Sequence, residues 1–121
     1  MFEVLYYEKN DGTKPAEEYI LSEDVKLQAK IFKELALLEE FGNALRMPHS
    51  KLLDDGIFEL RVIQGTDISR ILYFFVIGKR IILTNGFRKK TEKTPNEEIE
   101  KAKEYREDYK KRSKKEDGGY L

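Results

Sequence analysis

Residues 68–87 read ISRILYFFVIGKRIILTNGF and place two runs of β-forming side chains on either side of Gly78 and Lys79. The first run, residues 68–77, is almost continuously apolar, which is typical of a central strand covered on both faces. Gly78 and Lys79 predict a tight turn, so that residues 80–87 return as the neighbouring antiparallel strand. This hairpin predicts a sheet as the centre of the fold.

The segments before the hairpin extend the predicted sheet. IFELRVI (57–63) alternates between apolar side chains and the charged side chains of Glu59 and Arg61, as a strand with one buried face does. QGTD (64–67) has turn chemistry, so three consecutive strands are expected to form an antiparallel meander. FEVLYYE (2–8) is rich in β-forming residues and predicts an additional N-terminal strand.

A helical hairpin is expected between the N-terminal strand and the meander. PAEEYIL (15–21) begins with Pro, which the first turn of a helix accepts, and Ser22 or Asp24 is expected to cap the next helix. The apolar face of this second helix is expected to contain Val25, Ala29, Phe32, Leu35, Ala36 and Leu38. Gly42 supplies its stop signal, and residues 43–56 are expected to be a connection.

A final helix is expected after the meander. TPNE (94–97) has the form of a capping box with Pro at the first helical position, and the helix is predicted to reach about Arg112. Its inward side chains are expected to be Ile99, Ala102, Tyr105 and Tyr109. The sequence thus predicts one α+β domain, residues 1–112, with helices on one side of an antiparallel sheet, and a flexible tail, residues 113–121.

Composition indicates a single modest core and a highly charged surface. Hydrophobic residues make up 40% of the 121 residues and charged residues 38%. The absence of Cys excludes disulfides and thiolate metal ligands. No apolar run approaches the roughly 18 residues of a membrane span, and MFEVLYYEKN lacks the basic and apolar regions of a signal peptide. A cytoplasmic location is therefore expected.

Charge is distributed unevenly, although the formal net charge is zero. Residues 1–45 contain five Lys and ten Asp or Glu, a balance of −5, whereas residues 46–93 contain ten Lys or Arg and five Asp or Glu, a balance of +5. Residues 94–121 contain eight of each. A basic middle indicates either a face that meets an anion or attraction between acidic and basic parts of the fold.

The candidate site residues are cations. The sequence has no nucleotide-binding or zinc motif, its one His is His49 in a predicted loop, and the carboxylates of the basic middle are scattered. GFRKKTEKTP (86–95) instead brings four cations to the end of the last predicted strand. With the cations on or before the other strands, the candidate set is Lys51, Arg61, Arg70, Arg88, Lys89, Lys90 and Lys93. If the strands are neighbours, these groups can converge at one end of the sheet. Strand-end cations are also commonly only solvated, and Arg61 could instead pair with Glu59 or another carboxylate.

Three stretches, in their order along the chain, resemble one protein family. They are LRMPHSKLLDDGIFELR (45–61), RILYFF in the central strand and GFRKKTEKTP at the end of the sheet. They resemble the phage-derived Gp49-like, HigB-type branch of the RelE/ParE toxin superfamily, over about residues 1–112. The resemblance implies a RelE-like fold and the toxin of a type II toxin–antitoxin system. Such toxins typically cut mRNA, usually on the translating ribosome and without a metal or other cofactor, and are neutralised by an antitoxin that is often a helix-turn-helix protein.

Metal-free RNA cleavage suits a cationic site. The substrate's own 2′-hydroxyl can attack the adjacent phosphate, while the protein orients the phosphate, stabilises the transition-state charge and moves two protons. The resemblance implies a phosphate-stabilising role for Arg61, and the other catalytic candidates are Arg70, Arg88 and Lys90. Lys51, Lys89 and Lys93 are expected to bind RNA, and crowding of cations is one way to lower the pKa of a lysine towards neutrality.

Two other functions fit the same residues. ParE-like members share this fold but poison DNA gyrase by binding, without cutting RNA, and a fold alone does not determine function. An inactive phage protein that only binds RNA or an antitoxin also fits, because no general acid is assigned: Tyr73, Tyr105 and Tyr109 are expected in the core, and Tyr120 is in the tail. In each case an antitoxin is expected to contact the basic cleft or an exposed sheet edge.

Overall fold

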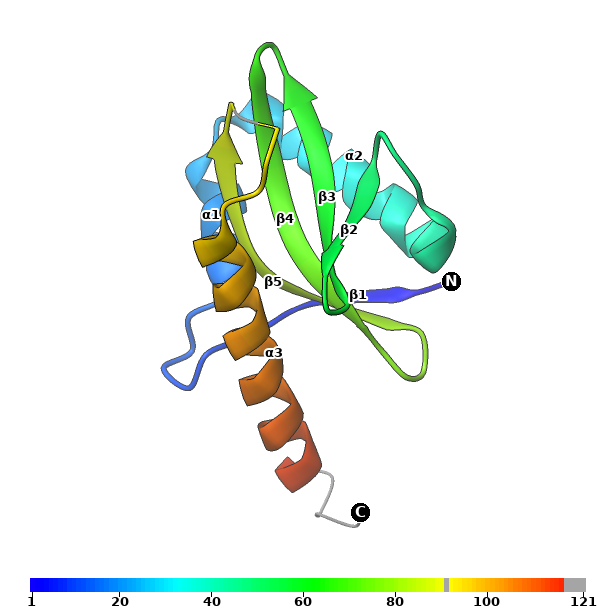
Figure 1. The fold of residues 1–121 in the computed structure, drawn as a ribbon, viewed down its shortest axis with the longest axis vertical. Helices are drawn as coiled ribbons and strands as arrows, with labels where there is room; N and C mark the ends of the chain where they lie inside the picture. The colour runs from blue at the N-terminus through cyan, green and yellow to red at the C-terminus, as the bar shows by residue number, and fades with distance from the viewer. Residues whose placement is uncertain (91, 117–121) are drawn as a thin grey trace.

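The computed structural model describes residues 1–90 and 92–116, with side chains as far as residue 113. The elements are β1 (Glu3–Tyr6), α1 (Pro15–Ser22), α2 (Val25–Phe41), the 3₁₀ helix η1 (Gly42–Ala44), β2 (Ser50–Asp54), β3 (Ile57–Gln64), β4 (Asp67–Val76), β5 (Arg80–Lys89) and α3 (Asn96–Glu116) (Figure 1). This is the α+β arrangement expected of a RelE-like fold. Within the described residues, no helix combines the length and apolar character that crossing a membrane requires.

The five strands form one sheet in the order β1-β5-β4-β3-β2. The apolar strand β4 lies in the middle, as predicted, and pairs antiparallel with β3 and β5. β1 joins the edge of the meander parallel to β5, an orientation that the expected antiparallel sheet did not include. Residues 50–54, expected to be part of a connection, form β2 and pair antiparallel with β3. Both additions depend on partners distant from the local turn signals, so the turn signals alone could not predict them.

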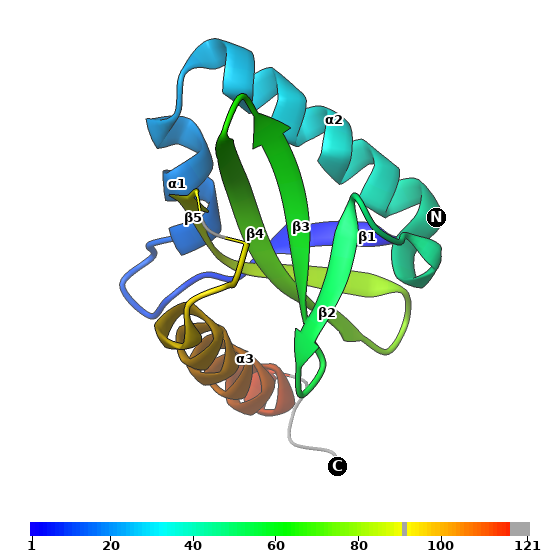
Figure 2. The same cartoon turned by 45° about the horizontal axis from the view of Figure 1, so that its top comes forward.

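Helices cover both faces of the sheet, so the expectation of helices on one side is wrong (Figure 2). The α1–α2 pair packs on one face around a cluster that includes Ile20, Ile31, Leu60 and Ile81. α3 packs on the other face around a smaller cluster that includes Leu72. Because side chains alternate along the nearly all-apolar β4, the strand contributes apolar side chains to both clusters. A continuously apolar strand therefore has to be covered by helices on both faces of the sheet.

The buried stripe of α2 is rotated from the predicted one. Its buried residues are Leu27, Ile31, Leu35 and Leu38. Val25 and Phe32, both expected inside, are 81% and 46% exposed. The helix has apolar residues on adjoining stripes, and packing against the sheet selects between them. Its ends follow the prediction, because Asp24 accepts a hydrogen bond from the Leu27 amide and Gly42 has the positive φ of a C-terminal cap.

α3 is held by apolar packing on the sheet and by polar contacts at its surface. Ile99 and Ala102 are buried, and Tyr105 and Tyr109 pack at the edge of the same cluster, as predicted. Ion pairs to the β2–β3 turn and a hydrogen bond from Tyr7 supplement this packing: Lys103–Asp54 at 2.6 Å, Arg106–Asp55 at 2.8 Å and Tyr7–Asp108 at 2.7 Å. The helix continues to Glu116, past the predicted end at Arg112, and residues 117–121 of the expected tail lie outside the described residues.

Candidate anion-binding groove

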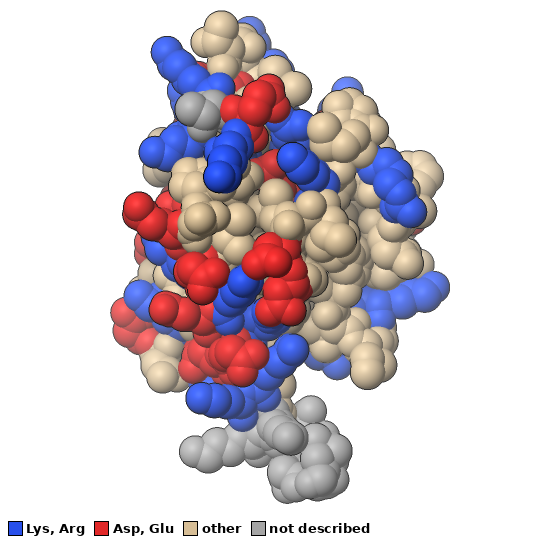
Figure 3. All heavy atoms as spheres, in the orientation of Figure 1, with Lys and Arg blue, Asp and Glu red and all other residues tan. Residues whose placement is uncertain are grey.

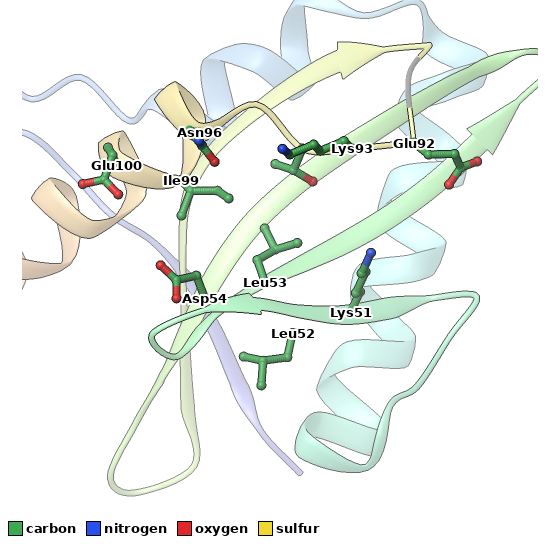
Figure 4. Close-up of a pocket in the computed structure, with 10 residues that line it drawn as sticks. Lys51, Leu52, Leu53, Asp54, Glu92, Lys93, Asn96, Ile99 and Glu100 are labelled. Carbon is green, nitrogen blue, oxygen red and sulfur yellow. The ribbon is translucent and has the colours of Figure 1, made fainter.

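A groove of about 490 Å³ lies between β2 and the start of α3, on the face of the sheet that α3 partly covers (Figure 4). Its described lining comes from β2, the segment 92–94 and the first turns of α3: Lys51, Leu52, Leu53, Asp54, Glu92, Lys93, Thr94, Asn96, Ile99 and Glu100. Leu53 and Ile99 face each other across its middle, and Lys51 reaches up from β2 towards the segment that carries Glu92 and Lys93. The groove therefore joins a charged end to an apolar middle.

Buried charges lie beside the charged end of the groove. Arg61 on β3 and Arg70 on β4 are direct cross-strand partners, an arrangement in which like charges repel. Glu59 lies between them, with Oε2 3.5 Å from Arg61 Nε and Oε1 3.5 Å from Arg70 Nε. The side chains of Arg61, Arg70 and Glu59 are only 7%, 0% and 1% exposed. The carboxylate of Glu59 is therefore what allows two guanidinium groups to be buried side by side.

Arg70 and Thr94 hold the segment that follows β5. Arg70 donates hydrogen bonds to the backbone carbonyls of Glu92, at 3.2 Å, and Lys93, at 3.3 Å. The hydroxyl of Thr94, predicted only as a helix cap, donates to Glu59. These bonds tie the backbone of residues 92–94 to β3 and β4. The complete burial of Arg70 favours a positioning role over the direct phosphate contact predicted from the sequence.

Arg61 directs one edge of its guanidinium towards the surface. Nε faces Glu59, Nη1 lies 3.6 Å from the sulfur of Met47, and Nη2 lies 3.1 Å from Oε2 of Glu92. The side chain of Glu92 is 85% exposed. The inner side of Arg61 thus faces a buried carboxylate, and its outer edge contacts an exposed one. An anion that binds this outer edge competes with Glu92.

Three of the described lysines lie on the face of the sheet that carries Arg61 or line the groove beside it. Lys51 pairs with Glu59 in the β2–β3 register, so it lies on the same face as Arg61, and both Lys51 and Lys93 line the groove. Lys89 pairs with Ile68 on β4, which places it on this face too, and Lys90 follows it as an exposed residue. In the space-filling view, Lys and Arg predominate over the end of β5, while Asp and Glu gather over α3 (Figure 3).

Arg88 does not join this group, and the expectation that all seven cations converge is wrong for it. Its register partner is Ser69, on the face covered by α1 and α2. There the guanidinium pairs with Glu23 and, at 3.1 Å, with Asp67. The hydrogen bond from Arg88 to Glu23 is the main cause of the raised pKa of Arg88. Because side chains alternate along a strand, the neighbouring residues Arg88 and Lys89 point to opposite faces of the sheet.

The pairing of Arg61 with Glu59, considered as an alternative from the sequence, is present in the structure. The burial of Glu59 and its second contact, with Arg70, were not predicted. Glu92 was treated as one of several scattered acids. No cluster of three or more potential metal ligands occurs among the described His, Cys, Asp and Glu residues. His49 pairs with Glu34 on α2, with 2.9 Å between Nδ1 and Oε2.

Tyr73 is part of the core, as predicted. Its side chain is fully buried, and its hydroxyl shares a hydrogen bond with Ser50 on β2. Burial raises the pKa of Tyr73 to about 12. At the other end of the groove, a hydrogen bond from Lys103 lowers the pKa of Asp54. Asp54 therefore stays ionised and helps hold α3 against β2.

The family of the chain follows from a comparison with protein-family models. Residues 18–107 match the family described as "Phage derived protein Gp49-like (DUF891)". The match spans most of the chain, including every element from α2 to β5, and the protein therefore belongs to this family. The Gp49-like family is part of the toxin superfamily of toxin–antitoxin systems, so an antitoxin partner is implied in general terms. No curated protein matches the chain.

Proposed function

We propose that this protein is the HigB-type toxin of a type II toxin–antitoxin pair and acts as an mRNA endoribonuclease. Its substrate is mRNA on the translating ribosome, and the consequence of cleavage is inhibition of translation. The reaction is attack of the ribose 2′-hydroxyl on the adjacent phosphate, which needs no metal ion. Family membership supports the toxin class, and the groove supports the RNA-cleaving activity within that class.

The observation that carries the proposal is the way Arg61 is held. A guanidinium matches the geometry of a phosphate with two parallel hydrogen bonds, but a flexible surface arginine loses side-chain entropy on binding. Here the carboxylate of Glu59 lies 3.5 Å from Nε on the buried side of Arg61, and the outer edge of the guanidinium contacts Glu92, which lines the groove. Fixed charges directed at a developing negative charge are the arrangement that stabilises a transition state most effectively.

The remaining cations have supporting roles in this proposal. Lys51 and Lys93 line the groove and bind phosphates on either side of the cleaved bond. Lys89 and Lys90 extend the positive surface along the RNA. Arg70 holds the backbone of Glu92 and Lys93 and positions the segment without touching RNA. Arg88 is bound to Glu23 and Asp67 on the opposite face and has no part in the reaction.

The antitoxin, in this proposal a helix-turn-helix protein, inhibits the toxin at the groove or at a sheet edge. The strand order leaves β1 and β2 as the two edges, and β2 also forms a wall of the groove. A strand or an acidic segment of the antitoxin that pairs with β2 would reach both surfaces. A complex in which the antitoxin leaves the groove and both edges exposed would contradict this proposal.

The test is 5′-end mapping of a reporter mRNA after induced expression of the protein in bacterial cells. The wild-type protein should produce new ends within translated regions. Arg61→Ala should reduce cleavage about 10²–10³-fold, the effect of removing one preorganised charge-stabilising donor. Lys90→Ala should weaken cleavage modestly, because it removes one exposed backbone contact.

Arg88→Ala is the matched control, since it removes the same side chain from the opposite face. It should cut as the wild type does at equal expression. Growth arrest with intact mRNA and loss of DNA supercoiling would replace the proposal with gyrase poisoning. Absence of both cleavage and arrest would make the protein an inactive binding protein, and cleavage that survives Arg61→Ala would remove Arg61 from the site.

A further inference from the structure

Glu92 holds the one outward-facing edge of Arg61. Its Oε2 lies 3.1 Å from Arg61 Nη2, and its side chain is 85% exposed. The carboxylate is thus in contact with solvent and with the guanidinium that the proposed reaction uses. In Figure 4, Glu92 stands at the charged end of the groove, on the segment that crosses above β3 and β4.

The backbone of Glu92 is fixed while its side chain is not enclosed. Arg70 binds the carbonyls of Glu92 and Lys93 from below, and Thr94 is bonded to the buried Glu59. The side chain can therefore rotate away from Arg61 without moving the segment. A phosphate that binds the outer edge of Arg61 would displace the carboxylate of Glu92 and leave it near the bound nucleotide.

We propose that Glu92 is the general base of the cleavage reaction, an inference that rests on the proposed ribonuclease function. After the phosphate replaces it on Arg61, the carboxylate accepts the proton of the attacking 2′-hydroxyl. The bond between O2′ and phosphorus forms, the bond between phosphorus and the 5′-oxygen breaks, and the leaving oxygen takes a proton from water. The products are a 2′,3′-cyclic phosphate and a 5′-hydroxyl end.

The charges that face Glu92 are consistent with this role. Arg61 on β3 contacts it directly, Lys93 is its neighbour along the chain, and Lys51 on β2 lines the same end of the groove. Glu59 lies behind Arg61 and is engaged by both arginines. These positive neighbours can hold a phosphate next to the carboxylate of Glu92, within reach of the 2′-hydroxyl that it is proposed to deprotonate.

The experiment measures cleavage of mRNA on purified translating ribosomes by purified protein, under single-turnover conditions and over a range of protein concentrations. Glu92→Gln keeps the size of the side chain and removes its basicity. Its rate at saturation should fall about 10²–10⁴-fold. Its half-saturating concentration should decrease, because a competing carboxylate no longer occupies Arg61. A structural defect would weaken binding and rate together, so opposite changes identify a catalytic base.

Glu97→Gln is the matched control. Glu97 is an exposed carboxylate in the first turn of α3 and is not part of the groove lining, so this variant should keep both parameters within about twofold of the wild type. A saturating rate within threefold of wild type for Glu92→Gln would overturn the assignment and make Glu92 only a competing anion. A lower rate with weaker binding or a lower melting temperature would overturn it too. Wild-type protein that leaves the mRNA intact would overturn the ribonuclease proposal itself, which distinguishes the two failures.

Discussion

The two faces of the sheet are covered by helices that are held in different ways. α2 buries Leu27, Ile31, Leu35 and Leu38 against a continuous apolar cluster. α3 fully buries much less, chiefly Ile99 and Ala102, and is tied by Asp54, Asp55 and Asp108 to cationic or phenolic partners. The helix α2 is attached mainly by apolar packing, whereas α3 combines a smaller apolar cluster with polar contacts at its surface.

This difference explains where the candidate site lies. On the α2 face the apolar layer is complete, and the one predicted catalytic cation that points there, Arg88, is paired at the surface. On the α3 face the apolar layer is interrupted by Glu59, Arg61 and Arg70, and the groove opens beside them. The proposed RNA-binding site therefore lies on the face where charged side chains replace part of the apolar core.

The largest effect on stability is expected from Glu59→Ala. It leaves Arg61 and Arg70 buried without the carboxylate between them, and breaking a buried charge network by removing one partner costs about 3–5 kcal/mol. The free energy of unfolding from urea denaturation measures this loss. Glu92→Ala, which removes an exposed partner of the same Arg61, should cost no more than about 1 kcal/mol. Equal losses for the two variants would show that burial of Glu59 is not what stabilises the pair.

The next effect is the loss of stability when a buried Ile is truncated to Ala on the α2 face or on the α3 face of the sheet. Ile31→Ala truncates a side chain that is 0% exposed under α2, and such a change should cost about 2–5 kcal/mol. Ile99→Ala truncates a side chain that is 9% exposed and lines the groove, so solvent can fill the space, and the cost should be about 1–2 kcal/mol. Thermal or urea unfolding of both variants measures the difference. A larger loss for Ile99→Ala would contradict the comparison.

The smallest effect is a selective loosening of α3 in acid. Hydrogen bonds from Tyr7 and Arg112 lower the pKa of Asp108 below its usual 3.8, and the hydrogen bond from Lys103 lowers the pKa of Asp54. A carboxylate with a lowered pKa in the folded state contributes stability above its unfolded pKa, and that contribution is lost as pH falls through the folded value. Hydrogen-exchange protection of α3 amides should therefore decrease below about pH 4.

The amides of α2 supply the internal reference for this acid effect, because its buried contacts are apolar. They should keep their protection over the pH range in which α3 loses it. Asp108→Asn should lower the protection of α3 at neutral pH and reduce its change with acid. Simultaneous loss of protection in both helices of the wild type would mean that the two covers open as one unit.

Local patterns predicted much of the fold. The alternation of residues 57–63, the apolar run after it and the turn at Gly78 predicted the meander, and the structure contains it with boundaries that shift by a residue or two. Asp24 and Gly42 marked the ends of α2 for the same reason, since caps and turns are made by residues close together in the chain. The stripe of α2 that faces the sheet was mispredicted, because two adjoining apolar stripes compete and only the partner surface selects one.

The sequence predicted that the candidate site is cationic, but it did not predict which residues form the site. Arg61 was recognisable because a charged residue interrupts an alternating strand, and Lys51 was selected as a cation before that strand. Their placement on one face depends on β2, which the sequence did not predict as a strand. Glu59 was considered only as a possible partner of Arg61, and Glu92 was missed, since neither carries a motif and both contacts depend on where Arg61 lies in the folded sheet.

The sequence by itself therefore determined the three strands of the meander and their turns, the N-terminal strand, the ends of α2 and the supply of cations to one region of the chain. Only the tertiary structure decided which cations lie on one face. The pairing of β2 with β3 places Lys51 on the same face as Arg61, and Glu59 lies between two arginines. The register of β5 places Arg88 on the opposite face. The reason is that alternation along a strand is local, whereas register and strand order are set by how the whole sheet packs. A shift of one residue in that register would exchange the two faces and, with them, the residues available to the site.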